Sequence, residues 1–289
     1  MTSSAAAIPS SPSSADSSNR RLYATDCDVP LVAGHRGSCS TAPENTLEAI
    51  ASAVHAGAYG IEVDVQLTAD GVLVLSRDLT LDRCTDIGEV LPEMAGHPVH
   101  DLTSEQVALV DAAAHWEAFE KVRVPLLDEV PAVLGPTTEV NIEIKDPAVN
   151  TGIVDVVAGT LAAPPWAELV DAGRVVVSSY HLDALRQLAQ LDTGVPMLLL
   201  VAMVPGPRRL EELGRELDGL IASYKLLAAG AVDRVHRAGL SLRVYSPNRP
   251  TDWMRMAELG VDVIDTDRPA EAIQFYRELE ARRLHRGHR

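Results

Sequence analysis

The 289-residue sequence has few lysines, cysteines and aromatic residues, and it lacks a long apolar segment. Its 41 acidic side chains outnumber the 25 basic ones, giving a formal net charge of −16. A broad basic surface for nucleic acid or for an anionic membrane is therefore not expected. No run approaches the roughly 18 apolar residues of a membrane-spanning helix. The three cysteines, Cys27, Cys39 and Cys84, show no zinc-type spacing, and we expect reduced thiols in a cytoplasmic protein.

The two ends of the chain differ in composition from the part between them. The start of residues 1–28 is rich in serine, alanine and proline. It has neither the charged start nor the apolar stretch of about 7–15 residues that marks a secretory signal. Because this composition buries little apolar surface, we predict a disordered leader over residues 1–28. Residues 277–289 are predicted to form a basic C-terminal tail, and residues 29–276 a single domain.

Short β-branched segments alternate with helical patterns from residue 31 onward, which is typical of a parallel sheet. The nine candidate strands are 31–34, 60–67, 72–76, 139–144, 175–179, 197–202, 220–223, 242–245 and 261–265. A (β/α)8 barrel needs one strand fewer, but the three residues 69–71 leave no room for a helix, so the second and third strands are expected to form a hairpin. Polar residues at the C-terminal ends of most strands favour a closed barrel over an open sheet. We therefore predict an α/β protein, a single-domain (β/α)8 TIM barrel with a small irregular insertion after the second or third strand.

Two of the predicted strands carry carboxylates on one face. Side chains alternate between the two faces of a strand, so Glu62 and Asp64 lie on the same side, as do Glu143 and Lys145. Burying like charges is costly unless a cation compensates them. Lys145 could answer Glu62 or Asp64 in a structural ion pair. A divalent cation held by oxygen ligands fits better, because three carboxylates outnumber the one lysine.

A histidine and an arginine follow the first predicted strand. His35 is placed for proton transfer, for which the ordinary histidine pKa of about 6.5 is suitable. Arg36 offers a planar cationic fork that suits a phosphate or a carboxylate. Each residue alone has a purely structural explanation, but their combination with Glu44 and the strand carboxylates indicates an active site.

Eight short motifs resemble those of the glycerophosphodiester phosphodiesterases. They are His35-Arg36-Gly37, Pro43-Glu44-Asn45-Thr46, Ile61-Glu62-Val63-Asp64, Thr80-Leu81-Asp82-Arg83, Ile142-Glu143-Ile144-Lys145, Ser178-Ser179-Tyr180, Gly260-Val261-Asp262 and Thr266-Asp267-Arg268-Pro269. They occur in family order from residue 31 to about residue 272. The resemblance implies a TIM barrel and a metal-dependent phosphodiesterase. Such an enzyme releases glycerol 3-phosphate and an alcohol from a small phosphodiester substrate.

The resemblance also implies roles for individual residues. One divalent cation, Mg²⁺ or Ca²⁺, would be held by Glu62, Asp64 and Glu143, with Glu44 as a further ligand. Arg36 and Lys145 would contact the substrate phosphate, and His35 would be one of two histidines that handle protons. Tyr180 and Tyr245 fall where such proteins place aromatic residues near the pocket. Neither a nucleic-acid partner nor a particular oligomeric state is implied.

One residue departs from the family pattern. Arg77 stands directly before Asp78, where the family has its second catalytic histidine. An arginine cannot deliver a proton near neutral pH, because its pKa exceeds about 12. It could instead neutralise charge on a phosphoryl oxygen. His181 could replace the missing proton donor, or it could simply begin the next helix.

The substitution leaves three functions open. Since general acid–base help is worth about 10²–10⁴-fold, the chain could be a phosphodiesterase of altered rate or substrate. It could also be a specialised phosphodiester cyclase, lyase or biosynthetic enzyme on the same fold. The third reading is a catalytically silent protein that binds a phosphate ligand. A metal ion and a phosphate compound would stabilise all three, but only an enzyme releases a product.

Overall fold

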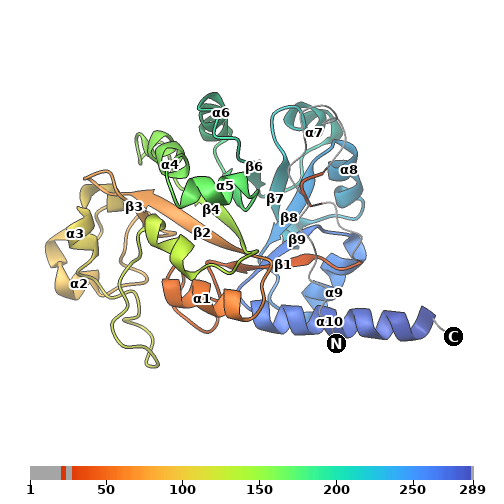
Figure 1. Cartoon of the computed structure of the whole chain (residues 1–289), viewed down its shortest axis with the longest axis horizontal. Helices are drawn as coiled ribbons and strands as arrows, with labels where there is room; N and C mark the ends of the chain where they lie inside the picture. Colours follow the sequence, from red (N-terminus) through yellow and green to blue (C-terminus); the bar gives the residue numbers. More distant parts are fainter. Residues whose placement is uncertain (1–20, 24–27, 288–289) are drawn as a thin grey trace.

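Eight parallel strands close into a barrel (Figure 1). The computed structural model describes residues 21–23 and 28–287 of the chain. The barrel strands are β1 (Leu31–His35), β2 (Gly60–Leu67), β4 (Glu139–Ile144), β5 (Val175–Ser179), β6 (Met197–Val201), β7 (Gly219–Ser223), β8 (Ser241–Tyr245) and β9 (Val263–Thr266). Each strand pairs with the next in parallel, and β1 pairs with both β9 and β2, which closes the barrel. The predicted TIM barrel is confirmed.

The ninth strand, β3 (Leu73–Leu75), lies outside the closed barrel and pairs with β2 in the antiparallel direction. Val65 is opposite Leu75 and Leu67 is opposite Leu73, so the two strands form the expected hairpin. The turn between them includes Gly71, whose φ of 79° is in the left-handed region that favours glycine. The extra strand in the sequence pattern therefore does not disturb the eightfold barrel.

Helices follow the strands and cover the outside of the barrel (Figure 1). They are α1 (Leu47–His55), α4 (Ile153–Leu161), α5 (Trp166–Asp171), α6 (Leu182–Gln190), α7 (Pro207–Leu213), α8 (Ala231–Arg237), α9 (Pro250–Leu259) and α10 (Pro269–Gly287), with the 3-10 turns η3 (Leu127–Val133) and η4 (Tyr224–Leu226). Ile61, Val63 and Ile142 point outward from their strands and are fully buried in the core beneath the helices. The alternate residues of the same strands are thus directed into the barrel.

A separate small unit lies between β3 and η3, at one end of the molecule in Figure 1. It contains only short elements: α2 (Ile87–Val90), η1 (Pro92–Met94), η2 (Val99–Asp101) and α3 (Ser104–Val107). Its own apolar core includes Val74, Leu81, Ile87, Val99 and Leu102. This unit is the irregular insertion that the sequence predicts.

The chain enters the barrel earlier than the predicted leader boundary at residue 28. Tyr23 is only 3% exposed, and its hydroxyl donates a hydrogen bond of 3.2 Å to Glu139 Oε1. Its backbone N–H donates to Ser241 Oγ at 3.1 Å. Because Glu139 and Ser241 begin β4 and β8, residues 21–23 cover the N-terminal end of the barrel. The other residues of the predicted leader, 1–20 and 24–27, lie outside the described residues.

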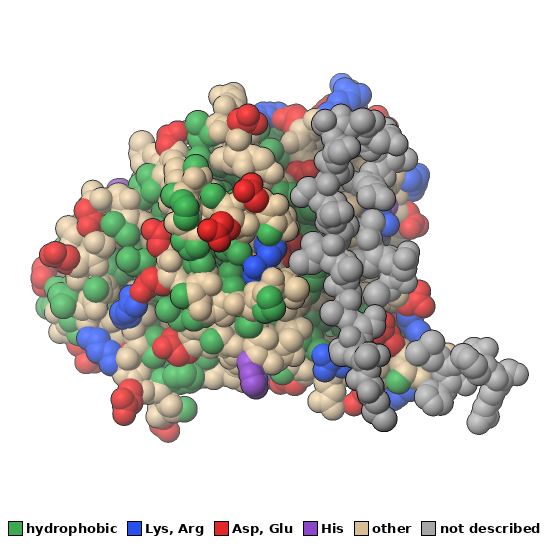
Figure 2. Space-filling model, viewed as in Figure 1, with side chains coloured by type: hydrophobic (Ala, Val, Ile, Leu, Met, Phe, Trp, Pro, Cys, Tyr) green, Lys and Arg blue, Asp and Glu red, His purple; other side chains and the backbone are tan. Residues whose placement is uncertain are grey.

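The C-terminal boundary also differs from the expectation. Helix α10 runs without interruption from Pro269 to Gly287, so the domain limit at residue 276 falls inside a helix (Figure 1). The predicted basic tail is therefore mostly the end of this helix, and residues 288–289 lie outside the described part. Within residues 21–23 and 28–287, none of the helices is both long and apolar enough to cross a membrane. On the face drawn in Figure 2, acidic and basic side chains are interspersed over the described surface.

Candidate active site

Three of the predicted carboxylates meet inside the barrel near the C-terminal ends of β2 and β4. The register places Asp64 beside Glu143 on the neighbouring strand, with Glu62 one pleat below. One ligand oxygen from each of Glu62, Asp64 and Glu143 lies within 4.8 Å of the others. All three residues are buried. The strands therefore bring these side chains together as their alternation predicts.

Two cationic side chains compensate part of this negative charge. Lys145 Nζ lies 2.9 Å from Asp64 Oδ1 and also donates to Glu143 Oε1. Arg36 Nε lies 3.0 Å from Asp64 Oδ2, and the Arg36 backbone N–H donates to Glu62 Oε2 at 2.9 Å. Structural ion pairing, the alternative to a metal, is thus present at Asp64 and Glu143. The ion pairs of Lys145 are with Asp64 and Glu143, and not with Glu62.

Glu62 is the carboxylate with capacity left for a further cation. Its Oε1 is buried and makes no hydrogen bond among the described residues. Burial raises the pKa of Glu62 well above its ordinary value, and the charges of Asp64 and Glu143 raise it further. Burial and Asp64 likewise raise the pKa of Glu143 to about 7, although Lys145 opposes them. Three carboxylates facing Arg36 and Lys145 form a hard, oxygen-rich donor set that fits one divalent cation.

Asp64 is held in place by an amide as well as by the two cations. Asn45 Nδ2 donates to Asp64 Oδ2 at 2.9 Å, and the Asp64 backbone N–H donates to Asn45 Oδ1 at 3.1 Å. Burial pushes the pKa of Asp64 upward, but Lys145 and Arg36 outweigh it and bring the pKa to about 2. Asn45 has a φ of 56°, a left-handed conformation that asparagine tolerates. The sequence pattern contained Asn45 but did not show this bracing role.

Glu44, the expected fourth metal ligand, forms ion pairs with two arginines. Its carboxylate accepts from Arg36 Nη1 at 3.0 Å and from both terminal nitrogens of Arg83 at 3.0 and 2.6 Å. Burial would raise the pKa of Glu44, but Arg83 and Arg36 together lower it. The group of close ligand oxygens consists of Glu62, Asp64 and Glu143 without Glu44. A ligand role for Glu44 therefore stays a prediction, and its contacts instead fix two arginines beside the carboxylates.

The turn that follows β1 needs an unusual backbone. Arg36 and Gly37 have φ values of 55° and 79°, both in the left-handed region. A Cβ atom on Gly37 would lie 2.4 Å from the backbone carbon of Ala49 in α1, so no other residue fits there. In this turn the Arg36 N–H donates to Glu62, and the left-handed φ of Arg36 has a conformational cost of the kind found at functional sites.

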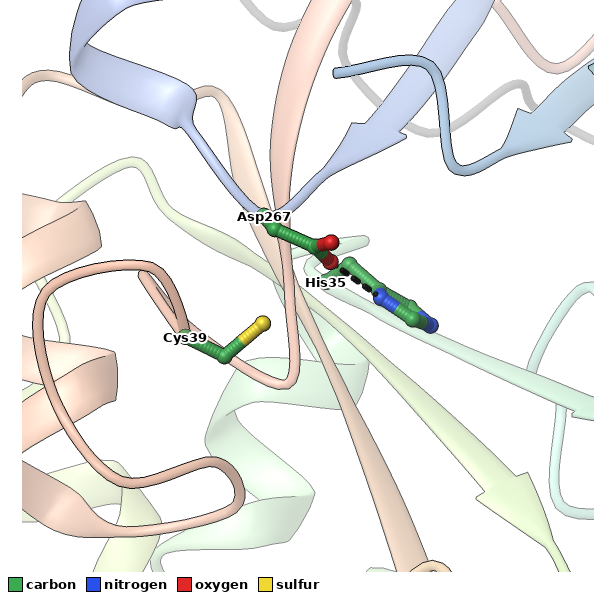
Figure 3. A group of neighbouring side chains, drawn as sticks. All are labelled: His35, Cys39 and Asp267. Atoms are coloured by element: carbon green, nitrogen blue, oxygen red, sulfur yellow. Dashed lines mark hydrogen bonds and ion pairs between the residues drawn. The ribbon is translucent and has the colours of Figure 1, made fainter.

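His35 is paired with an aspartate that the sequence reasoning did not assign. Its Nδ1 lies 2.7 Å from Asp267 Oδ1, and the opposite end of the ring points away from that carboxylate (Figure 3). Asn248 donates to the second oxygen of Asp267. Burial would raise the pKa of Asp267, but His35 and further hydrogen bonds bring it to about 2. Asp267 directly follows β9, and that position at a strand end was the available signal.

Arg77 lies on the loop after β3 and lines an open pocket of about 330 Å³. Glu143, Lys145, Tyr180 and His181 line the same pocket. The Arg77 side chain is 47% exposed, and its Nη1 lies 2.6 Å from Asp78 Oδ1. The residue that departs from the family pattern is therefore beside the carboxylate group rather than elsewhere on the surface.

The two predicted pocket tyrosines contact each other. The hydroxyl of Tyr180 donates to the hydroxyl of Tyr245 at 2.9 Å, across the barrel mouth between the ends of β5 and β8. His181 is the residue before α6, where its side chain forms no capping bond. Its Nε2 lies 3.9 Å from Asp146 Oδ1, on the pocket wall. The structure thus places Tyr180 and His181 on the pocket wall, whereas Tyr245 lines a neighbouring pocket and reaches the first one through Tyr180.

The barrel and its site define a class of protein. It is a TIM barrel that carries buried carboxylates, an arginine and a lysine suited to binding phosphate, and a histidine–aspartate pair at the C-terminal ends of its strands. The model of the glycerophosphoryl diester phosphodiesterase family matches residues 35–271. The chain belongs to this family of phosphoric diester hydrolases, which act on glycerophosphodiesters.

Individual relatives agree with this assignment over most of the chain. A glycerophosphodiester phosphodiesterase of Caldanaerobacter subterraneus is 34% identical over 251 residues, which are 86% of this chain and 98% of the relative. A glycerophosphodiester phosphodiesterase structure from Agrobacterium tumefaciens is 26% identical, has a TM-score of 0.67, and matches 84% of this chain and 98% of its own. An Oleispira antarctica phosphodiesterase, solved with its product sn-glycerol-3-phosphate, is 22% identical with a TM-score of 0.74, covering 86% of this chain and 96% of that one. This last likeness shows the fold.

Proposed function

We propose that this protein is a metal-dependent phosphodiesterase that hydrolyses glycerophosphodiesters to glycerol 3-phosphate and an alcohol. The observation that carries the proposal is the buried group of Glu62, Asp64 and Glu143, three carboxyl side chains that face only two cationic ones. The product found in the Oleispira structure supports the choice of substrate class. The choice between Mg²⁺ and Ca²⁺ and a cytoplasmic location stay predictions.

Glu62, Asp64 and Glu143 would hold the cation, which would supply positive charge to neutralise the phosphate and polarise a phosphorus–oxygen bond. Arg36 and Lys145 contribute fixed positive charge next to it. Lys145 can exchange a carboxylate oxygen for a phosphate oxygen, because both are anionic acceptors. These cations orient the diester and stabilise the additional charge that develops on the phosphoryl oxygens.

His35 would move the proton. Its Nδ1 is committed to Asp267 at 2.7 Å, so Nε2 is the nitrogen that faces the reacting groups. The aspartate fixes the tautomer and the orientation of the ring, which is the usual function of a carboxylate behind a catalytic histidine. One histidine can transfer a proton to or from one oxygen at a time. Either the attacking or the departing oxygen therefore lacks a histidine as its proton acceptor or donor.

Arg77→His tests what the family departure does. A histidine at residue 77 would supply a titrating group on the wall of the pocket that contains Glu143 and Lys145. We expect at least a tenfold gain in turnover with glycerophosphodiesters and a new pH dependence near neutrality. A nitrophenyl ester should gain much less, because its leaving group needs little protonation. Steady-state rates with both substrates across pH provide the measurement.

Two outcomes of the Arg77 experiment would contradict this account. A lower turnover in Arg77→His would mean that the arginine itself stabilises charge in the reaction, and the specialised enzyme, such as a cyclase, would replace the altered phosphodiesterase. Inactivity of both forms with every metal tried would favour the phosphate-binding protein. The position of Arg77 on the pocket wall is the observation that keeps the specialised enzyme as the second candidate.

Glu62→Gln tests the metal site without using activity. Adding Mg²⁺ or Ca²⁺ to the parent protein should raise its melting temperature, because the ion binds only the folded chain. The variant should lose this increase, since it removes the carboxylate whose Oε1 has no hydrogen-bond partner in the part of the chain that the structure describes. It should still fold, because one of several repelling charges is gone.

Asp183→Asn is the matched control for this experiment. The Asp183 side chain is 95% exposed, and its removal should leave the metal-dependent increase unchanged. Equal metal affinity in Glu62→Gln and the parent, measured by calorimetric titration, would refute the assignment of the site.

A further inference from the structure

A third potential ligand lies beside the histidine–aspartate pair. Cys39 is on the loop after β1, and its sulfur points toward His35 and Asp267 (Figure 3). A His35 ring nitrogen, the Cys39 Sγ and an Asp267 carboxylate oxygen all lie within 4.8 Å of one another. The thiol is half-buried and forms no disulfide with Cys84, the other cysteine among the described residues. This cluster is distinct from the three carboxylates described above.

The donor types in this cluster differ from those of the carboxylate group. One nitrogen, one sulfur and one oxygen are ligands of Zn²⁺ and of softer ions such as Cd²⁺, whereas Mg²⁺ and Ca²⁺ select oxygen. Tetrahedral Zn²⁺ with bonds of about 2.0–2.3 Å separates such ligand atoms by roughly 3.4–3.6 Å. Small side-chain adjustments would bring the three atoms to this spacing, with a fourth position left for water or a phosphate oxygen.

The surroundings pre-position the oxygen donor. Asn248 donates to Asp267 Oδ2, while its own carbonyl oxygen accepts from the Asp267 backbone N–H at 2.9 Å. These two hydrogen bonds resemble those by which neighbouring residues orient the ligands of a metal ion. The nearby charges have both signs: Asp267 and Glu44 favour a cation at Cys39, and Arg36 opposes it. Burial and Asp267 raise the pKa of Cys39, so the thiol keeps its proton until a metal ion displaces it.

We propose that His35, Cys39 and Asp267 form a second, inhibitory metal site that takes Zn²⁺ or Cd²⁺. The ion replaces the proton shared by His35 Nδ1 and Asp267 and the proton of the Cys39 thiol. The thiol proton goes to solvent, the imidazole proton moves from Nδ1 to Nε2 so that the ring stays neutral, and no oxidation state changes. Because His35 is then bound to metal rather than to Asp267 through a proton, it no longer transfers protons. The inhibitory consequence rests on the proposed function, but the binding does not.

Cobalt spectroscopy tests the binding independently of activity. Co²⁺ takes the geometry of Zn²⁺, and a cobalt–thiolate bond gives a near-ultraviolet charge-transfer absorption. The full chain, kept reduced and with Mg²⁺ present, should show this band at one equivalent of Co²⁺, and Zn²⁺ should abolish it. Cys39→Ser should lose the band. Cys84→Ser, the matched control at another half-buried free thiol, and Glu62→Gln should both retain it.

Inhibition is the second readout. Zn²⁺ should inhibit the Mg²⁺- or Ca²⁺-loaded enzyme, and Cys39→Ser should need at least about ten times more Zn²⁺ for half inhibition. Absence of the cobalt band in the parent, or its persistence in Cys39→Ser, would overturn the second site. A band that behaves as expected in a protein without phosphodiesterase activity would uphold the site and refute the proposed function instead.

Discussion

Replacing His35 by glutamine is expected to lower turnover of a glycerophosphodiester by about 10²–10⁴-fold, with a much smaller change in KM. Glutamine can hydrogen-bond but cannot gain and lose a proton near neutral pH. The bond of 2.7 Å between His35 and Asp267 orients the ring for that transfer, and the substitution removes this pair. Rates at saturating and limiting substrate separate the two effects.

The matched control for His35→Gln is His97→Gln. The His97 side chain is 51% exposed and pairs with Asp101 in the insertion, so its replacement should leave turnover unchanged. The metal-dependent increase in melting temperature should survive in both variants, because the carboxylate group is intact. Parental turnover in His35→Gln would remove His35 from the chemistry and would leave the proposed proton transfer without a base.

Arg243→Met is expected to destabilise the fold by about 3–5 kcal/mol, because breaking a buried ion pair leaves charge uncompensated. Arg243 is fully buried inside the barrel, where its Nη1 lies 2.9 Å from Glu139 Oε1. Its Nε lies 2.8 and 2.7 Å from the two oxygens of Asp265. Methionine fills similar volume but pairs with neither carboxylate. Thermal and urea unfolding should both record the loss.

Two variants calibrate the Arg243 result. Arg186→Met removes an exposed pair with Glu216 and should cost at most about 1 kcal/mol. Tyr23→Phe removes one hydrogen bond to Glu139 and should cost about 1 kcal/mol. If Arg243→Met lowered the free energy of unfolding no more than Arg186→Met does, a stabilising buried network of Arg243, Glu139 and Asp265 would be contradicted.

The barrel itself was predictable because strand periodicity is a local signal. Alternation in the segment containing Glu62 and Asp64 placed both carboxylates inside, and parallel pairing with the neighbouring strand brought Glu143 to them. The hairpin was predictable as well, since three residues cannot form a crossover helix. These inferences needed only the chain between adjacent strands.

Contacts between distant segments were not predictable in the same way. Asp267 is 232 residues from His35, and Tyr23 is 116 residues from Glu139. A disordered leader was the natural expectation for a serine-rich start, yet Tyr23 is buried. No local pattern reports that the first and last strands of a barrel lie side by side until the barrel is closed.

Which partner each carboxylate binds also could not be predicted from the sequence. The sequence offered Glu44 as a fourth ligand, but Arg83 and Arg36 bind its oxygens. Whether a carboxylate faces a metal or an arginine depends on side-chain reach across loops, which residue spacing does not encode. Cys39 gave no signal for the same reason, because its neighbours His35 and Asp267 come together only at the barrel mouth.

The most direct test of the central claim is the identity of the product. Phosphorus NMR of the full chain with a glycerophosphodiester and Mg²⁺ or Ca²⁺, in water labelled with heavy oxygen, reports both turnover and the bond that forms. We expect labelled glycerol 3-phosphate, formed with metal and not after chelation. A cyclic phosphate as the final product, or no turnover with any metal while the ion still raises the melting temperature, would contradict the assignment as a hydrolytic phosphodiesterase.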